Sequence, residues 1–541
     1  MENHELENQE SEKLKKDGSH RLNFEQVWDE IGHFGKIQWF YAAVLLFCSF
    51  PAGFSALMPV FTHFEEEFSC ADTRNSSNII SELGAEINST IDSCGEIHNN
   101  ICSIKCSTYQ FENKTFQTTV VSEFELVCQN WGVLPKGANT VMKMAFFAGF
   151  ATGSLLNGFV SDGFGRKTSI YIGSIAGMFL EMANSYSKHW MVYAVLRYLV
   201  GTFSMMVYAG GFILLQEYTG SRVRTSLGIS QSASFTVACV FLTIVAYFIR
   251  EWRSLQRIAV LVYIPILVCL YFIDESPRWN LLKGNEKQAK TTLQKIADKN
   301  GKNIKVEAPY VEQEPKSYSY IDLLQIDAKI SKSVMICLFM WFTNAIVYYG
   351  LSTNSAELPG TVFTNMFIMF TIEFPMYVFQ PRILESSFGR RKSNSLMFIT
   401  GGIACLLSTL TMELARTQCI TKLSLGDEYL GHPLIIANLT FAFIGKFFIG
   451  GSFANTWIWT LELFPTPIRG SALGFAGLGA RIGGILTPFL LGLQEIVPWL
   501  PGAVFGVMSL LAGVLCLSLP ETRGEKMLMT IEDALVLYGS K

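Results

Sequence analysis

The segment Glu217-Tyr-Thr-Gly-Ser-Arg-Val-Arg224 ends a long apolar run, and Glu462-Leu-Phe-Pro-Thr-Pro-Ile-Arg469 ends another in the second half of the chain with the same spacing from Glu to Arg. A second pair of segments repeats in the same order, Gly158-Phe-Val-Ser-Asp162-Gly-Phe-Gly165-Arg166-Lys167 and Phe388-Gly389-Arg390-Arg391-Lys392. The repetition predicts a chain built from two similar halves. Many secondary transporters are built from internal repeats of this kind.

Composition places the chain among membrane proteins. Half of its 541 residues are hydrophobic and only 16% are charged, and the apolar residues gather in stretches of about twenty, the length that crosses a bilayer. The net charge is only −3, and the basic residues form short clusters between the apolar stretches. Such a distribution excludes nucleic acid as an expected partner and indicates the lipid bilayer instead.

Hydropathy predicts an all-α membrane protein with twelve transmembrane helices in two six-helix halves. The spans of the first half are 37–60, 138–160, 169–187, 191–215, 226–249 and 256–273; those of the second are 331–350, 360–383, 395–414, 433–459, 471–493 and 497–518. The predicted domains are an N-terminal segment 1–36, a bundle 37–273, a linker 274–330, a bundle 331–518 and a tail 519–541.

The basic residues also predict orientation, because loops rich in Lys and Arg stay in the cytoplasm. Basic residues precede the first span, and Arg166 and Lys167, Arg222 and Arg224, and Arg390 to Lys392 follow spans two, four and eight. Both termini are therefore expected in the cytoplasm. The polar segment before the first span does not have the form of a cleavable signal peptide, so that span is expected to act as an uncleaved anchor.

The segment from 61 to 137 is then a large extracellular loop between the first two spans. It holds three glycosylation sequons, at Asn75, Asn88 and Asn113, and five cysteines, Cys70, Cys94, Cys102, Cys106 and Cys128. These features predict a glycosylated, disulfide-tied ectodomain of a plasma membrane protein. Because five is odd, one thiol is free or pairs elsewhere, for example with Cys419, and the connectivity stays open. A zinc site is the alternative, but His98 completes no ligand spacing, so no metal is expected.

The linker from 274 to 330 is charged and mixed in sign, and Glu286 to Asn300 has the pattern of an amphipathic helix. We expect helices on the membrane surface here instead of a catalytic domain.

The duplicated basic segments suggest a gating role. Gly165 suits a tight turn after span two, and Asp162 can pair with a nearby arginine or with a helix end. Arg390 in the second half holds the position that corresponds to Arg166. Positive-inside anchoring would explain the arginines equally well, but it does not explain the acidic residues at the ends of spans four and ten. The predicted latch between the two cytoplasmic faces therefore also includes Glu217, Arg224, Glu462 and Arg469.

These segments together resemble the major facilitator superfamily, in its family of organic cation, organic anion and carnitine transporters. The resemblance covers nearly the whole chain and follows these segments in order: Phe24-Glu-Gln-Val-Trp-Asp-Glu-Ile-Gly-His-Phe-Gly35, Thr119-Val-Val-Ser-Glu-Phe-Glu-Leu-Val-Cys128, Gly158 to Lys167, Arg197 with Gly201, Glu275-Ser-Pro-Arg-Trp279, Tyr348-Tyr349-Gly350, Glu462 to Arg469 and Pro520-Glu-Thr-Arg-Gly524. It implies a twelve-helix fold with one central substrate site. Two features depart from the family: Ser386 replaces the aspartate of the second basic segment, and the loop cysteines are odd in number.

Three ionisable residues lie deep in predicted spans, Glu373, Lys446 and Arg481. A charge at a helix centre costs about 2.5–3.5 kcal/mol on insertion scales, so each needs a partner or a function. One interpretation is that they neutralise one another. The other is that Arg481, in the small-residue segment from Gly477 to Gly484, binds a carboxylate of the substrate. In the resembled family, anion and carnitine carriers tend to have arginine here and cation carriers aspartate.

Aromatic residues suggest that the same site also holds an ammonium group or a flat ring. The candidates are Trp341, Tyr348, Tyr349 and Phe453, with Tyr377 one turn beyond Glu373. Packing is the more common role of such residues. Taken together, the residues predict a small organic ion as the transported partner, with carnitine-like zwitterions first, organic anions second and simple cations third.

Other functions are expected less. The chain lacks a phosphate-binding Gly-x-x-x-x-Gly-Lys-[Ser/Thr] loop and an evident nucleophile with its base, so we expect neither an enzyme nor a cofactor. A non-transporting receptor or scaffold is the alternative of another class. The coupling ion is not predicted.

Overall fold

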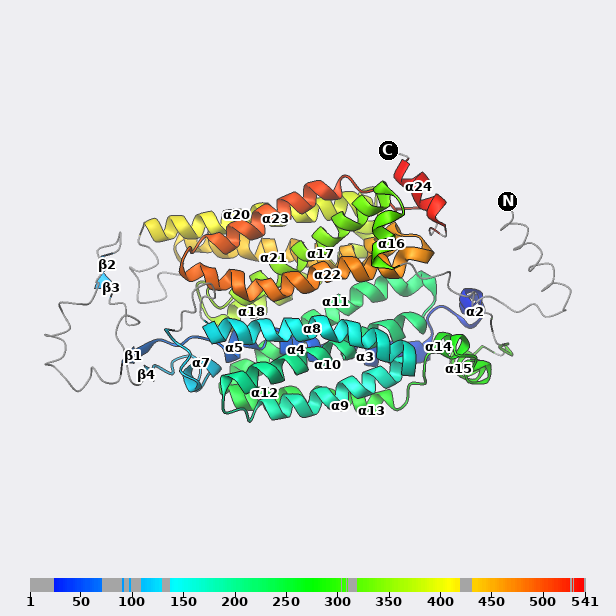
Figure 1. The fold of residues 1–541 in the computed structure, drawn as a ribbon, viewed down its shortest axis with the longest axis horizontal. Coiled ribbons are helices and arrows are strands. Elements are labelled where there is room, and N and C mark those ends of the chain that lie inside the picture. The colour runs from blue at the N-terminus through cyan, green and yellow to red at the C-terminus, as the bar shows by residue number, and fades with distance from the viewer. Residues whose placement is uncertain are drawn as a thin grey trace.

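We analysed a computed structural model of the protein, which describes residues 24–70, 90–91, 97–98, 109–128, 137–302, 304–307, 309, 319–418, 431–525, 528 and 530–539. The long helices form two groups that lie side by side, the lower one from the first half of the chain and the upper one from the second (Figure 1). Helices α2 and α24, the first and last described, lie at the same end of the bundle, opposite the short strands β1 to β4.

The first group holds the helices that match the first six predicted spans. They are α3 (Lys36–Phe47), α4 (Phe50–Leu57) and α5 (Pro59–Thr62), then α8 (Gly137–Phe164), α9 (Arg166–Asn184), α10 (Trp190–Glu217), α11 (Ser221–Phe248), α12 (Trp252–Val260) and α13 (Tyr263–Leu270). The second group consists of α17 (Ala328–Asn354), α18 (Val362–Thr371), α19 (Glu373–Glu385), α20 (Gly389–Thr417), α21 (Pro433–Leu463), α22 (Thr466–Gly492) and α23 (Leu500–Cys516), with a short 3₁₀ turn, Leu493–Glu495, before α23.

Every predicted span is thus helical. Among the described residues, ten segments are long and apolar enough to cross a membrane. Helix α9 is not among these ten, and α23 is apolar but shorter. The multi-pass character of the protein is therefore evident.

Prolines explain why three of the spans consist of more than one helix. Pro51 follows the break between α3 and α4, Pro265 the break between α12 and α13, and Pro375 the break between α18 and α19. Proline has no N–H to donate and its ring clashes with the preceding turn, so it fits easily in the first turn of a helix and kinks or breaks a helix further in. The break at Ile372 places Glu373 in the first turn of α19, deep in the bundle.

Glycines bring helices of one half close together. A Cβ at Gly149, Gly153 or Gly201 would collide with the backbone where α8 and α10 cross, and one at Gly479 or Gly483 would do so where α22 crosses α17. Small residues at crossings allow the van der Waals contacts that hold membrane helices together, because lipid gives little hydrophobic drive between helices. Between the halves, α8 packs on α22, and α11 packs on α18, α19 and α21.

The loop between the first two spans contains strands, so the all-α expectation is correct only for the helical bundle. Strand β1 (Phe68–Cys70) pairs antiparallel with β4 (Tyr109–Phe111), and β2 (Thr90–Ile91) with β3 (Ile97–His98). They are followed by the short helix α7 (Val120–Glu123). Asn113 is exposed, and Cys128 forms a disulfide. The sequons at Asn75 and Asn88, and Cys94, Cys102, Cys106 and Cys419, lie outside the described residues.

Short helices gather at the other end of the bundle. The linker contains α14 (Pro277–Leu282), α15 (Glu286–Lys299) and α16 (Tyr320–Gln325), and α2 (Phe24–Ile31) and α24 (Ile531–Gly539) lie at the same end (Figure 1). The predicted amphipathic helix is confirmed as α15. Its apolar side, with Leu293 and Ile296, shares one buried cluster with Trp28 and Ile31 of α2. The linker helix is therefore packed against the bundle by one face.

Candidate functional site

A central cavity lies between the two halves and contains most of the predicted site residues. Its second-half lining consists of Trp341, Tyr348, Tyr349, Tyr377, Gly450, Phe453, Trp457 and Arg481. The first half supplies Phe150, Tyr208, Ser232 and Phe235. The cavity encloses about 60 Å³, which is room for a few water molecules. A substrate of several heavy atoms can enter only when the walls move apart.

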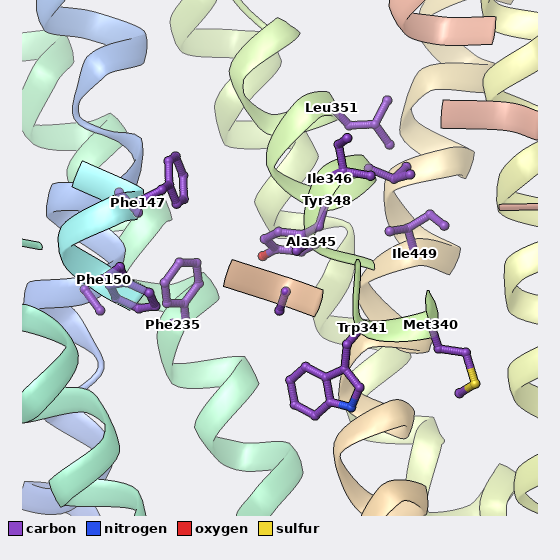
Figure 2. Close-up of a cluster of buried hydrophobic side chains, with 14 of the residues drawn as sticks. Phe147, Phe150, Phe235, Met340, Trp341, Ala345, Ile346, Tyr348, Leu351 and Ile449 are labelled. Atoms are coloured by element: carbon purple, nitrogen blue, oxygen red, sulfur yellow. The ribbon is translucent and has the colours of Figure 1, made fainter. Parts of the chain in front are cut away.

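Aromatic rings form most of the wall. Figure 2 shows Phe147, Phe150 and Phe235 of the first half across from Tyr348 and Trp341 of the second. The rings of Tyr348 and Phe453 meet edge-on at 5.7 Å, as do those of Trp341 and Trp457 at 4.5 Å. Such faces attract cations and flat rings.

Glu373 and Lys446 lie behind this wall and contact each other. Lys446 Nζ is 3.0 Å from Glu373 Oε1, and both side chains are fully buried. The other carboxylate oxygen accepts hydrogen bonds from Thr236 at 2.7 Å and from Tyr377 at 2.9 Å, with the Tyr348 hydroxyl at 3.3 Å. The structure therefore joins two of the three deep charges in an ion pair, as the first interpretation expects of them.

Arg481 is the exception. It is partly buried in the cavity wall, and in the described part of the chain no carboxylate lies within 4.0 Å of its guanidinium. Its recorded contacts are Met205 Sδ at 4.0 Å and the ring of Phe150 at 5.5 Å. A guanidinium that faces a cavity without a carboxylate partner is available to an anionic ligand.

The sequence did not point to the first-half lining, Phe150, Tyr208, Ser232 and Phe235. Uncharged residues within apolar runs do not show from sequence whether they face lipid, a neighbouring helix or a cavity. Trp457 could have been found, because it lies one helical turn beyond Phe453 and so on the same face.

Aromatic contacts close the cavity toward both ends of the bundle. Toward the strand end, Phe363 of α18 stacks on Phe61 at 5.8 Å and lies 5.5 Å from Phe116, which the loop before α7 supplies. Toward the other end, Phe212 of α10 meets Trp457 of α21 at 5.6 Å. Each contact joins the two halves, so opening on either side must separate one of them.

The predicted gating residues form a network at the linker end of the first half. Arg166 pairs with Glu217 at 3.2 Å and with Asp162 at 2.9 Å. Glu275, directly before α14, accepts hydrogen bonds from the backbone N–H groups of Arg166 and Lys167 at the start of α9. A Cβ at Gly165, where φ is +108°, would fall on that carboxylate.

The second half repeats the network. Arg390 pairs with Glu462 at 3.0 Å, and Glu521 accepts from the backbone of Arg390 and Arg391. Gly389, at φ +66°, lies against Glu521 as Gly165 does against Glu275. Where the first network has Asp162, Arg390 instead donates to the Leu384 carbonyl, which fits the presence of Ser386 in the sequence.

The ion pairs of both networks lie within the halves. Arg166 and Glu217 belong to helices of the first half, and Arg390 and Glu462 to helices of the second, so the expected latch between the halves stays a prediction. Arg224 donates to the carbonyls of Gln216 and Thr219, and Arg469 to that of Phe464. They stabilise the turns before and within the next helix. A role of all these residues in gating stays a prediction.

Glu275 and Glu521 were not predicted as members of the networks. The signal was present, since Glu275-Ser276 follows span six and Glu521-Thr522 follows span twelve, at matching places in the two halves.

Comparison with known proteins agrees with this architecture. The model of the sugar (and other) transporter family matches residues 104–534. The organic cation transporter protein of Drosophila melanogaster is 31% identical over 79% of this chain and 76% of its own length. The chain belongs to the organic ion transporter family of the major facilitator superfamily.

Further members of this family align over most of the chain. Organic cation transporter 1 of Caenorhabditis elegans is 28% identical over 95% of this chain and 88% of its own, and human organic cation/carnitine transporter 2 is 28% identical over 85% and 79%. The inward-open xylose transporter XylE of E. coli superposes with a TM-score of 0.60 at 15% identity, over 92% of this chain and 98% of its own, which shows the same fold. The homologues are transporters, and this organic ion transporter family member is accordingly a membrane transporter and not an enzyme.

Proposed function

We propose that this protein carries small zwitterions of the carnitine type across the plasma membrane by alternating access, with the substrate carboxylate on Arg481. The observation that carries the proposal is the Arg481 guanidinium, which faces the central cavity with no carboxylate within 4.0 Å in the described chain. A carboxylate there accepts two parallel hydrogen bonds.

The ammonium end of the substrate is proposed to lie against the aromatic wall. Glu373 was the expected partner for that group, but its carboxylate is occupied by Lys446, Thr236 and Tyr377. The rings of Tyr349, Phe453 and Trp457 remain in the wall and suit a quaternary ammonium, which makes no hydrogen bonds. The relatives named for organic cations and for carnitine support an ammonium-bearing substrate.

An organic anion is the second candidate, and the Glu373–Lys446 pair is the observation that favours it. Because the pair is neutral, Arg481 gives the cavity a net positive charge. An anion with a flat ring would satisfy both Arg481 and the aromatic wall.

The proposed topology has twelve spans in two bundles, 37–273 and 331–518, with both termini and the linker 274–330 in the cytoplasm. The 61–137 loop is then extracellular, with Asn113 available for a glycan. The placement of α2, α14, α15 and α24 at the end opposite the strands supports this arrangement (Figure 1). Protease treatment of sealed cells tests it: cleavage within the loop but not in the linker is expected, and the reverse would overturn the topology.

The transport experiment measures uptake of radiolabelled carnitine, p-aminohippurate and tetraethylammonium into proteoliposomes. A hydrogen-bonded charge contributes about 1.5–3 kcal/mol, so Arg481→Ala should lower carnitine uptake roughly tenfold to hundredfold. Arg481→Lys, which keeps the charge but not the fork of donors, should retain part of it.

The three probes separate the alternatives. Uptake of p-aminohippurate alone, sensitive to Arg481→Ala, would replace the zwitterion by the anion. Tetraethylammonium uptake that Arg481→Ala leaves unchanged would overturn the role of Arg481. Uptake of none of them by folded protein would favour the receptor or scaffold.

A further inference from the structure

Lys446 occupies a site that has the composition of an ammonium-binding site. Its Nζ lies 3.0 Å from Glu373 Oε1 and 2.7 Å from Ser352 Oγ. It also lies over two aromatic rings, 3.0 Å from the centroid of Tyr348 and 4.7 Å from that of Phe370. One carboxylate with two aromatic faces is the arrangement by which proteins recognise alkylammonium ligands.

The carboxylate of this site is fixed by groups other than the lysine. The hydroxyls of Thr236 and Tyr377 donate to Glu373 Oε2, and Thr236 comes from α11 of the first half. Gly450 leaves room beside it, since a Cβ there would lie 3.2 Å from the Glu373 carboxyl carbon. Glu373 would therefore keep its position if Lys446 lost its charge.

The site adjoins the central cavity. Tyr348 and Tyr377 each bond Glu373 and each line the cavity, so their side chains form the boundary between the two spaces. The Lys446 ammonium is fully buried on the far side of that boundary. A free cation that replaced it would be separated from the central cavity by the side chains of Tyr348 and Tyr377.

A purely structural ion pair does not account for all of these contacts. Pairing alone requires that Glu373 and Lys446 meet, which the 3.0 Å contact provides. It does not require a tyrosine face directly under the ammonium, nor a second ring, nor hydroxyls from two helices on the other oxygen.

We infer that Lys446 is a tethered cation that fills a latent binding site for small organic ammonium ions, and so excludes cations from Glu373. The inference deepens the proposed function and rests on it in one point. With Glu373 neutralised by Lys446, Arg481 is the charged group of the cavity that binds the substrate. The attachment of the lysine to α21 makes its local concentration far higher than that of any free cation. Loss of Lys446 should therefore create a cation-binding site.

The test compares Lys446→Met with the double variant Lys446→Met/Glu373→Gln. Tetraethylammonium binding is measured calorimetrically on the full-length protein in lipid nanodiscs. We expect Lys446→Met to bind tetraethylammonium at least tenfold more tightly than the wild type, and the double variant to bind no better than the wild type. Both variants carry the same methionine and glutamine has nearly the size of glutamate, so the two variants differ in the charge at position 373 and little in the space available.

Two results would overturn the inference. One is unchanged tetraethylammonium affinity in folded Lys446→Met. The other is an equal gain in the double variant, because the gain would then come from added space and not from the uncovered carboxylate. Lys446→Arg is the matched control; it keeps a cation on the same helix and should show no gain.

Folding of Lys446→Met is the remaining concern, because it leaves a buried carboxylate without its counter-charge. Purification in the presence of tetraethylammonium should restore its yield and raise its thermal midpoint, with no such effect on the double variant. Absence of rescue counts against the inference. The binding result can be separated from the proposed function. If Arg481→Ala left carnitine uptake unchanged, the substrate assignment would be refuted, but the tetraethylammonium binding of Lys446→Met would not be affected.

Discussion

Among the described residues, each half of this transporter has a carboxylate and a cation with no exposed surface, yet the surroundings of these charges differ between the halves. In the second half, Glu373 and Lys446 meet at 3.0 Å and satisfy each other. In the first half, Glu181 and Arg197 are also fully buried, but neither has an ion-pair partner within 4.0 Å among the residues that the structure describes. Arg197 donates to the Ser55 carbonyl at 2.6 Å, and the Ser55 hydroxyl lies 3.5 Å from Glu181.

This difference between the halves shows that a buried charge need not be a paired charge. Complete burial is common to all four charges, so burial alone does not say which of them depend on each other. The second-half pair acts as one neutral unit, whereas each first-half charge depends on nearby backbone, hydroxyl and aromatic groups, such as the ring of Phe146 under Arg197 at 4.8 Å. Substitutions should therefore have very different costs in the two halves.

Breaking the second-half pair should have the largest effect. Removing one partner of a buried ion pair costs about 3–5 kcal/mol, since the other charge stays buried. Glu373→Gln should therefore lower thermal stability strongly, and Lys446→Met/Glu373→Gln should recover most of the loss. Thermal unfolding of the four proteins of this double-mutant cycle in nanodiscs measures the coupling. Additive losses would show that the two residues act independently.

The duplicated networks at the linker end offer the next comparison, because here the two halves are alike. Gly165→Ala and Gly389→Ala each force a side chain into positive φ, at a cost of about 1–3 kcal/mol, and each pushes on a carboxylate, Glu275 or Glu521. Equal losses of stability are expected. Gly163→Ala is the control, since a Cβ there meets nothing within 4 Å. A loss confined to one half would break the symmetry.

Much of this architecture could be predicted from the sequence. Each span that hydropathy predicted is helical in the structure. The repeats identified Arg166, Glu217, Arg390 and Glu462, which the structure then joins in pairs. Which deep charges contact one another could not be predicted. Glu373 and Lys446 lie on different helices, and their contact depends on the break at Ile372 and on how α19 packs against α21. Sequence gives the depth of a residue but not its direction around the helix axis.

The first-half charges should respond weakly to neutralisation. Glu181→Gln removes a carboxylate that has no ion-pair partner among the described residues. The substitution removes the cost of burying its charge and also its modest attraction to Arg197, and the two effects oppose each other. We expect a change of at most about 1 kcal/mol, well below that of Glu373→Gln. The same unfolding assay measures it. A loss as large as that of Glu373→Gln would mean that Glu181 and Arg197 are as strongly coupled as the second-half pair, and the contrast between the halves would disappear.

The smallest expected effect concerns pH and Glu275 at the linker end of the first half. Burial raises the pKa of the Glu275 carboxyl above its usual value of 4.5, although hydrogen bonds from Ser276, Lys167 and Arg166 oppose the shift. The folded protein therefore holds this proton more tightly than the unfolded chain does. Stability from this group is present below pH 4.5 and is lost as pH rises through the raised pKa.

Glu275→Gln isolates this contribution, because glutamine does not titrate. The difference in thermal midpoint between the wild type and Glu275→Gln should shift against the wild type as pH is raised from 4 toward neutrality. A shift in the opposite direction would mean that the backbone N–H groups at the start of α9 outweigh burial. The charged Glu275 carboxylate would then stabilise the turn at Gly165 more than the protonated form does. Its hydrogen bonds to the N-terminus of α9 would in that case outweigh the cost of burying its charge.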